Sequence, residues 1–238
     1  MDFFKIKKNL AALGVLGLVA LSFLIYTIST NKPADTPINL SVNESKGILT
    51  LAFDDGLKSQ HEVAFREMQK YGYKGTLFLI ANWTEYFESK ELMYFEEARE
   101  MQDSGWEIGS HSLTHRKLTS LSLKELEKEL KESKENLEKE GFNISSFAFP
   151  YGSYNWWVLQ ETKEYYSASK PMRDGFNSIE NPDVYELKSK WALKKHSSEE
   201  VCSWIKKANQ ENLWLILVFH NIYEERTPWE FSEQKFKE

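Results

Sequence analysis

The stretch ILTLAFDDG, residues 48–56, decides the fold of this chain, because an apolar strand runs directly into a polar cluster there. Residues 48–53 are apolar apart from Thr50, which predicts a buried β-strand. Further strands are predicted at 75–80, 106–109, 144–149, 166–169, 184–189 and 213–219, and helices at 59–71, 90–104, 122–140 and 198–210. This alternation predicts an α/β fold with a parallel sheet, and a distorted (β/α) barrel fits it best.

The composition narrows the class of protein. Of the 238 residues, 41% are hydrophobic and 14% aromatic, so the chain can bury a sizeable core. The net charge of −6, with both signs interspersed, gives no support to a nucleic-acid-binding surface. Cys202 is the only cysteine, which excludes an intramolecular disulfide and a thiolate metal cluster. A metal site in this chain must therefore use histidines and carboxylates.

The first thirty residues have the pattern of a membrane anchor. Lysines at positions 5, 7 and 8 precede an apolar run at 10–28, which as a helix is long enough to cross a hydrocarbon core of about 30 Å. The positive-inside rule places the lysines in the cytoplasm and everything after the run outside the cell. We expect a retained single-pass anchor in the cell membrane; the alternative is a cleaved signal that releases a secreted protein.

The chain therefore divides into three parts. Residues 1–30 form the cytoplasmic tip and the anchor, residues 31–45 form a short tether, and residues 46–238 form one extracellular domain.

Two polar segments have the residues of a metal site. Asp54 and Asp55 are adjacent carboxylates, which repel each other unless a cation or a shared proton separates their roles. His111 and His115 are four residues apart, which on a helical turn points both imidazoles at one ion; two surface histidines in a loop are the alternative. One aspartate and two histidines leave a position for water, as in catalytic zinc sites. Because no glutamate separates the histidines, Asp54 is the natural general base.

Two further segments end predicted strands with groups that suit the same site. FAFPYG at 147–152 turns through Pro150, and its backbone N–H groups could face the site; an ordinary turn is the alternative. LILVFH at 215–220 ends an apolar strand with His220, which fits either a general acid or a core histidine.

Taken in order, the four segments resemble the motifs of the polysaccharide deacetylase family, the NodB-homology or carbohydrate esterase family 4 domain. Those motifs are FDDG, H-S/T-x-x-H, a Pro-Tyr-Gly turn and a late strand that ends in histidine. The resemblance covers residue 46 to the C-terminus and looks closest to extracellular, membrane-tethered members. It implies a distorted (β/α) barrel and metal-dependent removal of acetyl groups from N-acetylated sugar polymers. The implied substrates are peptidoglycan, chitin-like polymers and poly-N-acetylglucosamine.

The same resemblance implies a role for each matching residue. A divalent metal ion, Zn²⁺ above all, would have three ligands: Asp55, His111 and His115. Asp54 would be the base and His220 the acid. Tyr151, which follows Pro150, would lend its backbone N–H to the oxyanion.

One position departs from the family pattern. The family often has an arginine that orients the catalytic aspartate, and Ala148 occupies that place here. Arg173 and Asp174 fall where the family's fourth motif would lie and could orient Asp54 and His220. A surface turn with two charges is an equal alternative for this pair.

The end of the chain is a second departure. Residues 231–238 start an amphipathic helix, and the family usually continues through this helix into another strand. We therefore expect a barrel that lacks its last strand. The strand with the unpaired edge would be a preceding one, for which 213–219 is the candidate.

Two other functions are compatible with the sequence. The same scaffold could serve another metal-dependent amidase or esterase, for instance one that acts on acetylated xylan. The second is a catalytically weak surface protein that binds carbohydrate, since the eight tryptophans could stack on sugar rings.

Overall fold

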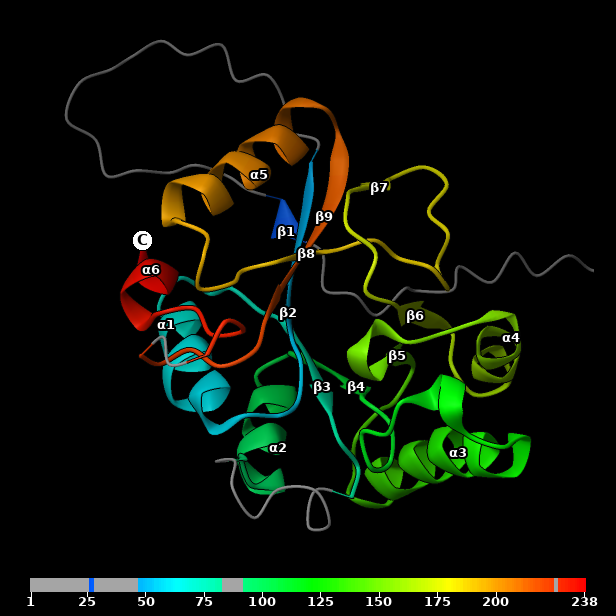
Figure 1. The fold of residues 1–238 in the computed structure, drawn as a ribbon. Helices are drawn as coiled ribbons and strands as arrows, with labels where there is room; N and C mark the ends of the chain where they lie inside the picture. Colours follow the sequence, from blue (N-terminus) through cyan, green and yellow to red (C-terminus); the bar gives the residue numbers. More distant parts are fainter. Residues whose placement is uncertain (1–25, 28–46, 83–91, 225–226) are drawn as a thin grey trace, which may run out of the picture.

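A mixed β-sheet organises the computed structural model, which describes residues 26–27, 47–82, 92–224 and 227–238 (Figure 1). Its strands are β1 (Tyr26–Thr27), β2 (Ile48–Phe53), β3 (Thr76–Leu79), β4 (Glu107–Ser110), β5 (Ser146–Ala148), β6 (Ala168–Lys170), β7 (Asn177–Ser178), β8 (Lys190–Trp191) and β9 (Leu213–Phe219). The strand order is β6-β5-β4-β3-β2-β9-β7, with β1 beside β2 and β8 beside β9. Pairing is parallel except where β1 meets β2 and β7 meets β9.

Helices flank this sheet (Figure 1). They are a π-helix (Gln60–Phe65) that continues into α1 (Arg66–Gln69), α2 (Phe95–Asp103), α3 (Leu123–Lys139), α4 (Trp156–Tyr165), α5 (Ser198–Gln210) and α6 (Glu233–Lys237), with short 3-10 turns at Leu118–Ser120 and Pro150–Gly152. The helix predicted at 122–140 begins with a capping box: the Ser122 side chain accepts a hydrogen bond from the Glu125 N–H, and the Glu125 carboxylate accepts one from the Ser122 N–H.

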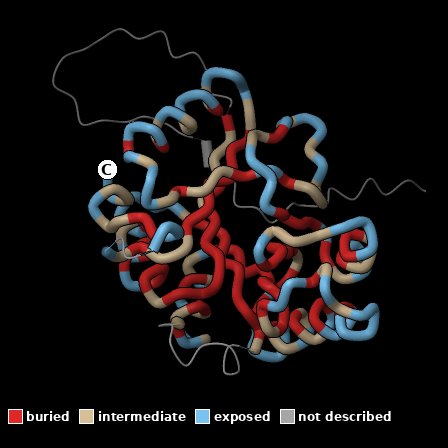
Figure 2. Tube along the Cα trace, viewed as in Figure 1, coloured by how far each residue is buried: buried red, intermediate tan, exposed pale blue. Residues whose placement is uncertain are grey.

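The pair β2 and β9 forms the centre of the sheet. The two strands run parallel and in register over six residues, from Ile48 opposite Trp214 to Phe53 opposite Phe219. Figure 2 shows that buried residues concentrate along these central strands, whereas the outer helices carry the exposed ones. Because the strands end together, the residues that follow them emerge at the same edge, and the Asp54 N–H donates to the Phe219 carbonyl oxygen (3.0 Å).

The predicted open edge is wrong for the strand at 213–219. In the described part of the chain β9 has neighbours on both sides: β2 on one, and β8 and β7 on the other. The C-terminal helix α6 also covers the central strands, since the Phe236 ring lies 5.0 Å from the Phe219 ring and 6.3 Å from the Phe53 ring, centroid to centroid. The short strands β7 and β8 thus provide the pairing that the sequence pattern did not reveal.

The predicted strand at 184–189 is also wrong. Residues 184–186 form a turn, and the strand begins only at Lys190 as β8. The apolar pattern arises because this turn packs on β6: Ser169 donates its N–H to the Val184 carbonyl (2.8 Å), and Leu187 donates its N–H to the Ser169 carbonyl (3.2 Å). Leu187 is fully buried there without belonging to a strand. The helix α4 and the antiparallel strand β7 were not predicted.

The predicted anchor and tether lie outside the described residues, apart from Tyr26–Thr27. These two residues form β1 rather than the end of a helix. They pair with Ile48 and Leu49, whose backbone is accessible on that side because β3 pairs only with Ala52 and Phe53. Among the helices that the structure describes, none is both long enough and apolar enough to cross a membrane.

Glu107, at the start of β4, carries a carboxyl group buried inside the sheet. It accepts hydrogen bonds from Thr76 Oγ1 on β3 (3.0 Å) and from Ser146 Oγ on β5 (2.8 Å). Burial outweighs these bonds and raises the pKa of Glu107 from 4.5 to about 7. Between these two values the folded chain binds more protons than the unfolded chain, so stability falls as the pH rises through this window.

We expect Glu107→Gln to remove this pH dependence and to stabilise the chain above neutral pH by up to about 3 kcal/mol, because one pKa unit corresponds to about 1.4 kcal/mol. Denaturant unfolding at about pH 5 and about pH 8 measures the effect. Glu164→Gln, an exposed substitution on α4, is the control and should follow the parent chain. If the free energy of unfolding of Glu107→Gln falls between these two pH values as much as that of the parent chain, Glu107 is not the group responsible for the pH dependence.

Candidate active site

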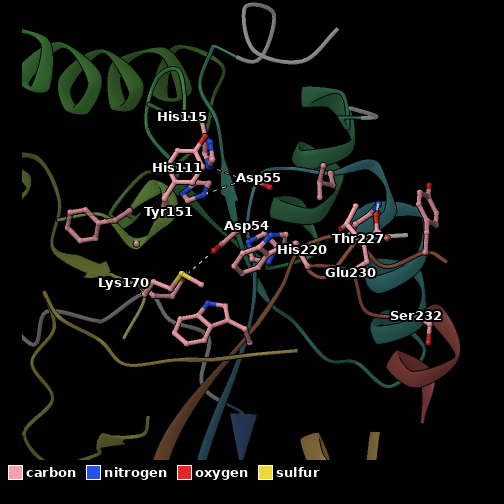
Figure 3. Close-up of a pocket in the computed structure, with 18 of the residues that line it drawn as sticks. Asp54, Asp55, His111, His115, Tyr151, Lys170, His220, Thr227, Glu230 and Ser232 are labelled. Atoms are coloured by element: carbon pink, nitrogen blue, oxygen red, sulfur yellow. Dashed lines mark hydrogen bonds and ion pairs between the residues drawn. The ribbon is translucent and has the colours of Figure 1, made fainter. Parts of the chain in front are cut away.

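A pocket of about 1080 Å³ opens where the carboxyl ends of the parallel strands meet (Figure 3). Most of the residues singled out from the sequence line it, and they come from the ends of four strands: Asp54 and Asp55 after β2, His111 and His115 after β4, Tyr151 after β5, and His220 after β9. Pro150 is buried beneath Tyr151 in the same turn. Parallel α/β folds place their active sites at this edge of the sheet.

Asp55, His111 and His115 form a compact set of possible metal ligands. Asp55 Oδ1 lies 3.4 Å from His111 Nε2 and 3.3 Å from His115 Nε2, and one ligand atom of each residue falls within 4.8 Å of the others. All three side chains are buried. Burial would raise the pKa of Asp55, but hydrogen bonds from His111 and His115 hold it well below its ordinary value. An ionised carboxylate and two imidazoles suit a divalent transition metal.

The backbone fixes which nitrogen of His111 can bind a metal. His111 Nδ1 lies 2.8 Å from the Ala148 carbonyl oxygen, which only accepts hydrogen bonds. Nδ1 therefore keeps its proton when a metal ion binds, and Nε2, which faces Asp55, is the nitrogen that would release its hydrogen bond to Asp55 and bind the ion.

The predicted helical turn between the two histidines is wrong. Residues 111–115 form a loop, in which Ser112 and His115 have φ values of 68° and 58°. This left-handed backbone turns the two imidazoles toward each other, with ring centroids 4.8 Å apart. Ser112 Oγ accepts a hydrogen bond from the His115 N–H (2.9 Å) and so holds the turn.

Strained backbone is concentrated in this pocket. Among the described residues, five that are not glycine have positive φ: Asp55, Ser112, His115, Tyr151 and Asn212. Four of the five belong to the site or to the loop between its histidines. Such conformations cost about 1–3 kcal/mol each and are typical of functional sites.

Glu129 on α3 holds the histidine loop (residues 111–115) in place through hydrogen bonds. It was not among the residues predicted from the sequence. Its buried carboxylate accepts hydrogen bonds from the N–H groups of Leu113 (3.1 Å) and Thr114 (2.9 Å) and from the Thr114 hydroxyl. Glu129 stands in a lysine- and glutamate-rich helix, so its only signal in the sequence is its place on the face that carries Leu126 and Leu130.

Lys170, the last residue of β6, is a second residue that the sequence analysis missed. Lys170 Nζ donates to Asp54 Oδ2 (2.9 Å), and both side chains are buried. Burial would raise the pKa of Asp54, but the positive charges of Lys170, His111 and His220 outweigh it and lower the pKa. Asp54 Oδ1 is buried and has no hydrogen-bond partner among the described residues, so one oxygen is held by lysine and the other is left to accept a proton.

Lys170 is the direct neighbour of Ala148 across the strand pair β5–β6. The cation that the family pattern would place at position 148 is therefore found here on the neighbouring strand. Figure 3 shows Asp54 between Lys170 and His220.

The structure does not bring Arg173 and Asp174 to Asp54 and His220. Arg173 donates to Glu186 (2.8 Å), and Asp174 accepts from Lys190 (2.9 Å). Both residues are exposed. They form the charged surface turn that was the alternative interpretation.

His220 lies on the opposite side of the aspartates from the histidine loop (Figure 3). Burial lowers its pKa, although the charges of Asp55 and Asp54 act in the other direction. Gln60, which was not predicted, ties the ends of the two central strands together, since its Nε2 donates to the carbonyl oxygens of Asp54 (2.5 Å) and His220 (3.1 Å).

The comparisons with known proteins agree with this arrangement. A family model described as polysaccharide deacetylase matches residues 41–167, just over half of the chain. The peptidoglycan-N-acetylmuramic acid deacetylase PdaC of Bacillus subtilis (strain 168) is 29% identical over 134 residues, which are 54% of this chain and 27% of that protein. The chain spans less than half of the length of the curated relatives it matches.

Two solved structures are also similar. The Streptococcus pyogenes deacetylase PplD, solved in complex with acetate, has a TM-score of 0.54 and 28% identity, covering 58% of this chain and 62% of PplD. BC0361, a polysaccharide deacetylase from Bacillus cereus, has a TM-score of 0.51 and 32% identity, covering 58% of this chain and 45% of BC0361. These similarities confirm the predicted distorted (β/α) barrel.

We expect Glu129→Gln to weaken metal binding about 10- to 100-fold, because residues that orient metal ligands typically contribute this much. A single amide oxygen cannot accept all three hydrogen bonds that hold the histidine loop. Calorimetric titration with Zn²⁺ measures the affinity, and Glu135→Gln, an exposed substitution on the same helix, is the matched control. Equal affinity in the two variants would mean that other contacts position the loop.

Proposed function

Because the chain belongs to the polysaccharide deacetylase family, we propose that its domain is a metal-dependent hydrolase that removes N-acetyl groups from a polysaccharide containing N-acetylglucosamine. The observation that carries this proposal is the meeting of three metal-ligand side chains, a separate buried carboxylate and a histidine in one pocket. PdaC is named for a deacetylase activity, and PplD was solved with acetate, the product of such a reaction. Both support the proposal without identifying the polymer.

Zn²⁺ is the metal ion that we propose for Asp55, His111 and His115. Two imidazoles and a carboxylate are the donor set of catalytic zinc sites, which keep a position for water. When bound, the ion would supply Lewis acidity that lowers the pKa of water to about 7.

The side chains divide the remaining chemistry between them. Asp54, held ionised by Lys170, accepts the proton of the water whose oxygen attacks the acetyl carbonyl carbon. The C–N bond then breaks, and His220 donates a proton to the departing nitrogen, which leaves poorly as an anion. The products are acetate and a free amine. Tyr151 lines the pocket with its ring beside His115, and its backbone N–H would stabilise the oxyanion.

The place of action in this proposal is the cell surface. This location is proposed because residues 1–30 contain lysines followed by an apolar run, a pattern that favours a single-pass anchor with the domain outside the cell. Peptidoglycan, chitin-like polymers and poly-N-acetylglucosamine are the substrates to compare.

We expect substitutions of the two adjacent aspartates to have different effects on metal binding and turnover. Asp55→Ala should lose the bound metal, because it removes one of three ligands, whereas Asp54→Asn should keep the metal and lower turnover by about 10²- to 10⁴-fold. Metal analysis and acetate release from N-acetylglucosamine hexamer measure the two effects. Asp174→Asn, an exposed aspartate outside the pocket, is the control. Equal metal loss in both aspartate variants would refute the division of labour.

We also expect that the positive charge beside Asp54 can be supplied by a residue of either β6 or β5. Lys170→Met should lower kcat at least about tenfold with the metal retained, because breaking a buried ion pair leaves an uncompensated charge. Lys170→Arg should keep much of kcat, and adding Ala148→Arg to Lys170→Met should restore part of it. No recovery in either variant, with metal content and melting temperature intact, would show that Lys170 does not act through its charge.

A further inference from the structure

Two adjacent tryptophans with exposed side chains begin α4. Trp156 and Trp157 are 62% and 63% exposed, and their rings lie edge to face with centroids 4.6 Å apart. Trp106 and Trp214, by contrast, are buried in the core. Core packing therefore explains those two tryptophans and does not explain the pair on α4, which presents a large aromatic surface.

The pair lies at the same edge of the sheet as the pocket. It follows Tyr151, which lines the pocket, by five residues of chain, and these span at most about 18 Å. Figure 1 shows α4 next to β5 and β6, the strands whose ends carry Tyr151 and Lys170. A polymer held in the pocket can therefore reach the two tryptophans within a few sugar units.

The segment between the pocket and the pair is held in place at each step. Ser153 Oγ and Thr119 Oγ1 share a hydrogen bond (2.7 Å), and the Tyr154 hydroxyl donates to Glu186 (2.5 Å). Asn155 caps α4, with its Oδ1 accepting from the Val158 N–H (3.0 Å). The start of α4, which carries the two tryptophans, is consequently fixed relative to the pocket.

Aromatic faces also stand at the pocket itself, on both sides of the aspartates. The Tyr151 ring, 55% exposed, packs against His115 (4.7 Å between centroids), and the Trp229 ring, 48% exposed, lies 5.8 Å from the His220 ring. Aromatic faces suit the apolar C–H faces of sugar rings, while the hydroxyls of the sugar stay in water. Tyr151 and the α4 pair thus carry aromatic surface outward from the pocket on one side of the aspartates, and Trp229 stands on the other side.

We propose that Trp156 and Trp157 bind sugar units of the same polysaccharide chain whose acetyl group enters the pocket, an inference that rests on the proposed function. The ligand is a neutral N-acetylated glycan several sugars long. The enzyme then acts on residues within a chain and favours long substrates over short ones.

Tyr71 and Tyr73 provide a matched control. They are also an exposed, stacked pair, 66% and 43% exposed with centroids 5.9 Å apart. They lie just before β3, at the amino ends of the strands, which is the edge of the sheet opposite the pocket.

The test is the affinity of the full chain for N-acetylglucosamine hexamer and dimer, measured by calorimetry with Asp54→Asn as the background so that no turnover interferes. Adding Trp156→Ala and Trp157→Ala should raise the Kd for the hexamer about tenfold, and the preference for hexamer over dimer should fall with it. Replacing both tryptophans by phenylalanine should keep most of the hexamer affinity. Adding Tyr71→Ala and Tyr73→Ala should change nothing.

Unchanged hexamer affinity in the alanine variant would overturn the inference. So would a variant that keeps hexamer binding but loses binding to phosphatidylcholine vesicles, because the pair would then face a lipid surface. Failure of this inference can be distinguished from failure of the proposed function. If the parent chain binds hexamer through the pair but releases no acetate, the proposed function is wrong and the glycan site stands.

Discussion

The parallel, in-register pairing of β2 with β9 is the constraint on which the pocket depends. Because both strands end at the same level, Asp54 and His220 leave the sheet side by side, and Gln60 ties their two backbones together. A shift of this register by one residue would turn one of the two side chains to the other face of the sheet and so separate the pair. The strands β7 and β8 keep β9 in the interior of the sheet, so the site does not lie at a free edge.

Opposite charges separate the roles of the two adjacent aspartates. Asp55 faces two imidazoles from the β4 loop, whereas Asp54 faces the ammonium group of Lys170. Two buried carboxylates side by side would otherwise repel each other and take up protons. The cation stands on β6, next to Ala148 on β5, so the strand that neighbours β5 supplies the positive charge to Asp54.

Local patterns in the sequence predicted the strands at 48–53 and 213–219, the capped helix after Ser122 and most of the residues that line the pocket. They succeeded because each motif directly follows an apolar strand. The contributions of Lys170 and Glu129 could not be predicted, since their partners lie far away in the sequence and depend on strand order and helix packing. The same holds for 184–189, where burial against β6 imitates a strand, and for His111 to His115, where left-handed backbone replaces the expected helical turn.

We expect one metal ion to bind Asp55, His111 and His115 while Asp54 stays outside its coordination sphere. Anomalous diffraction at the zinc edge, on crystals of the chain grown with Zn²⁺, tests this directly. We predict a single peak in the pocket, bonded to these three side chains at about 2.0–2.2 Å. A peak that is also bonded to Asp54, or the absence of a peak at these residues, would contradict it.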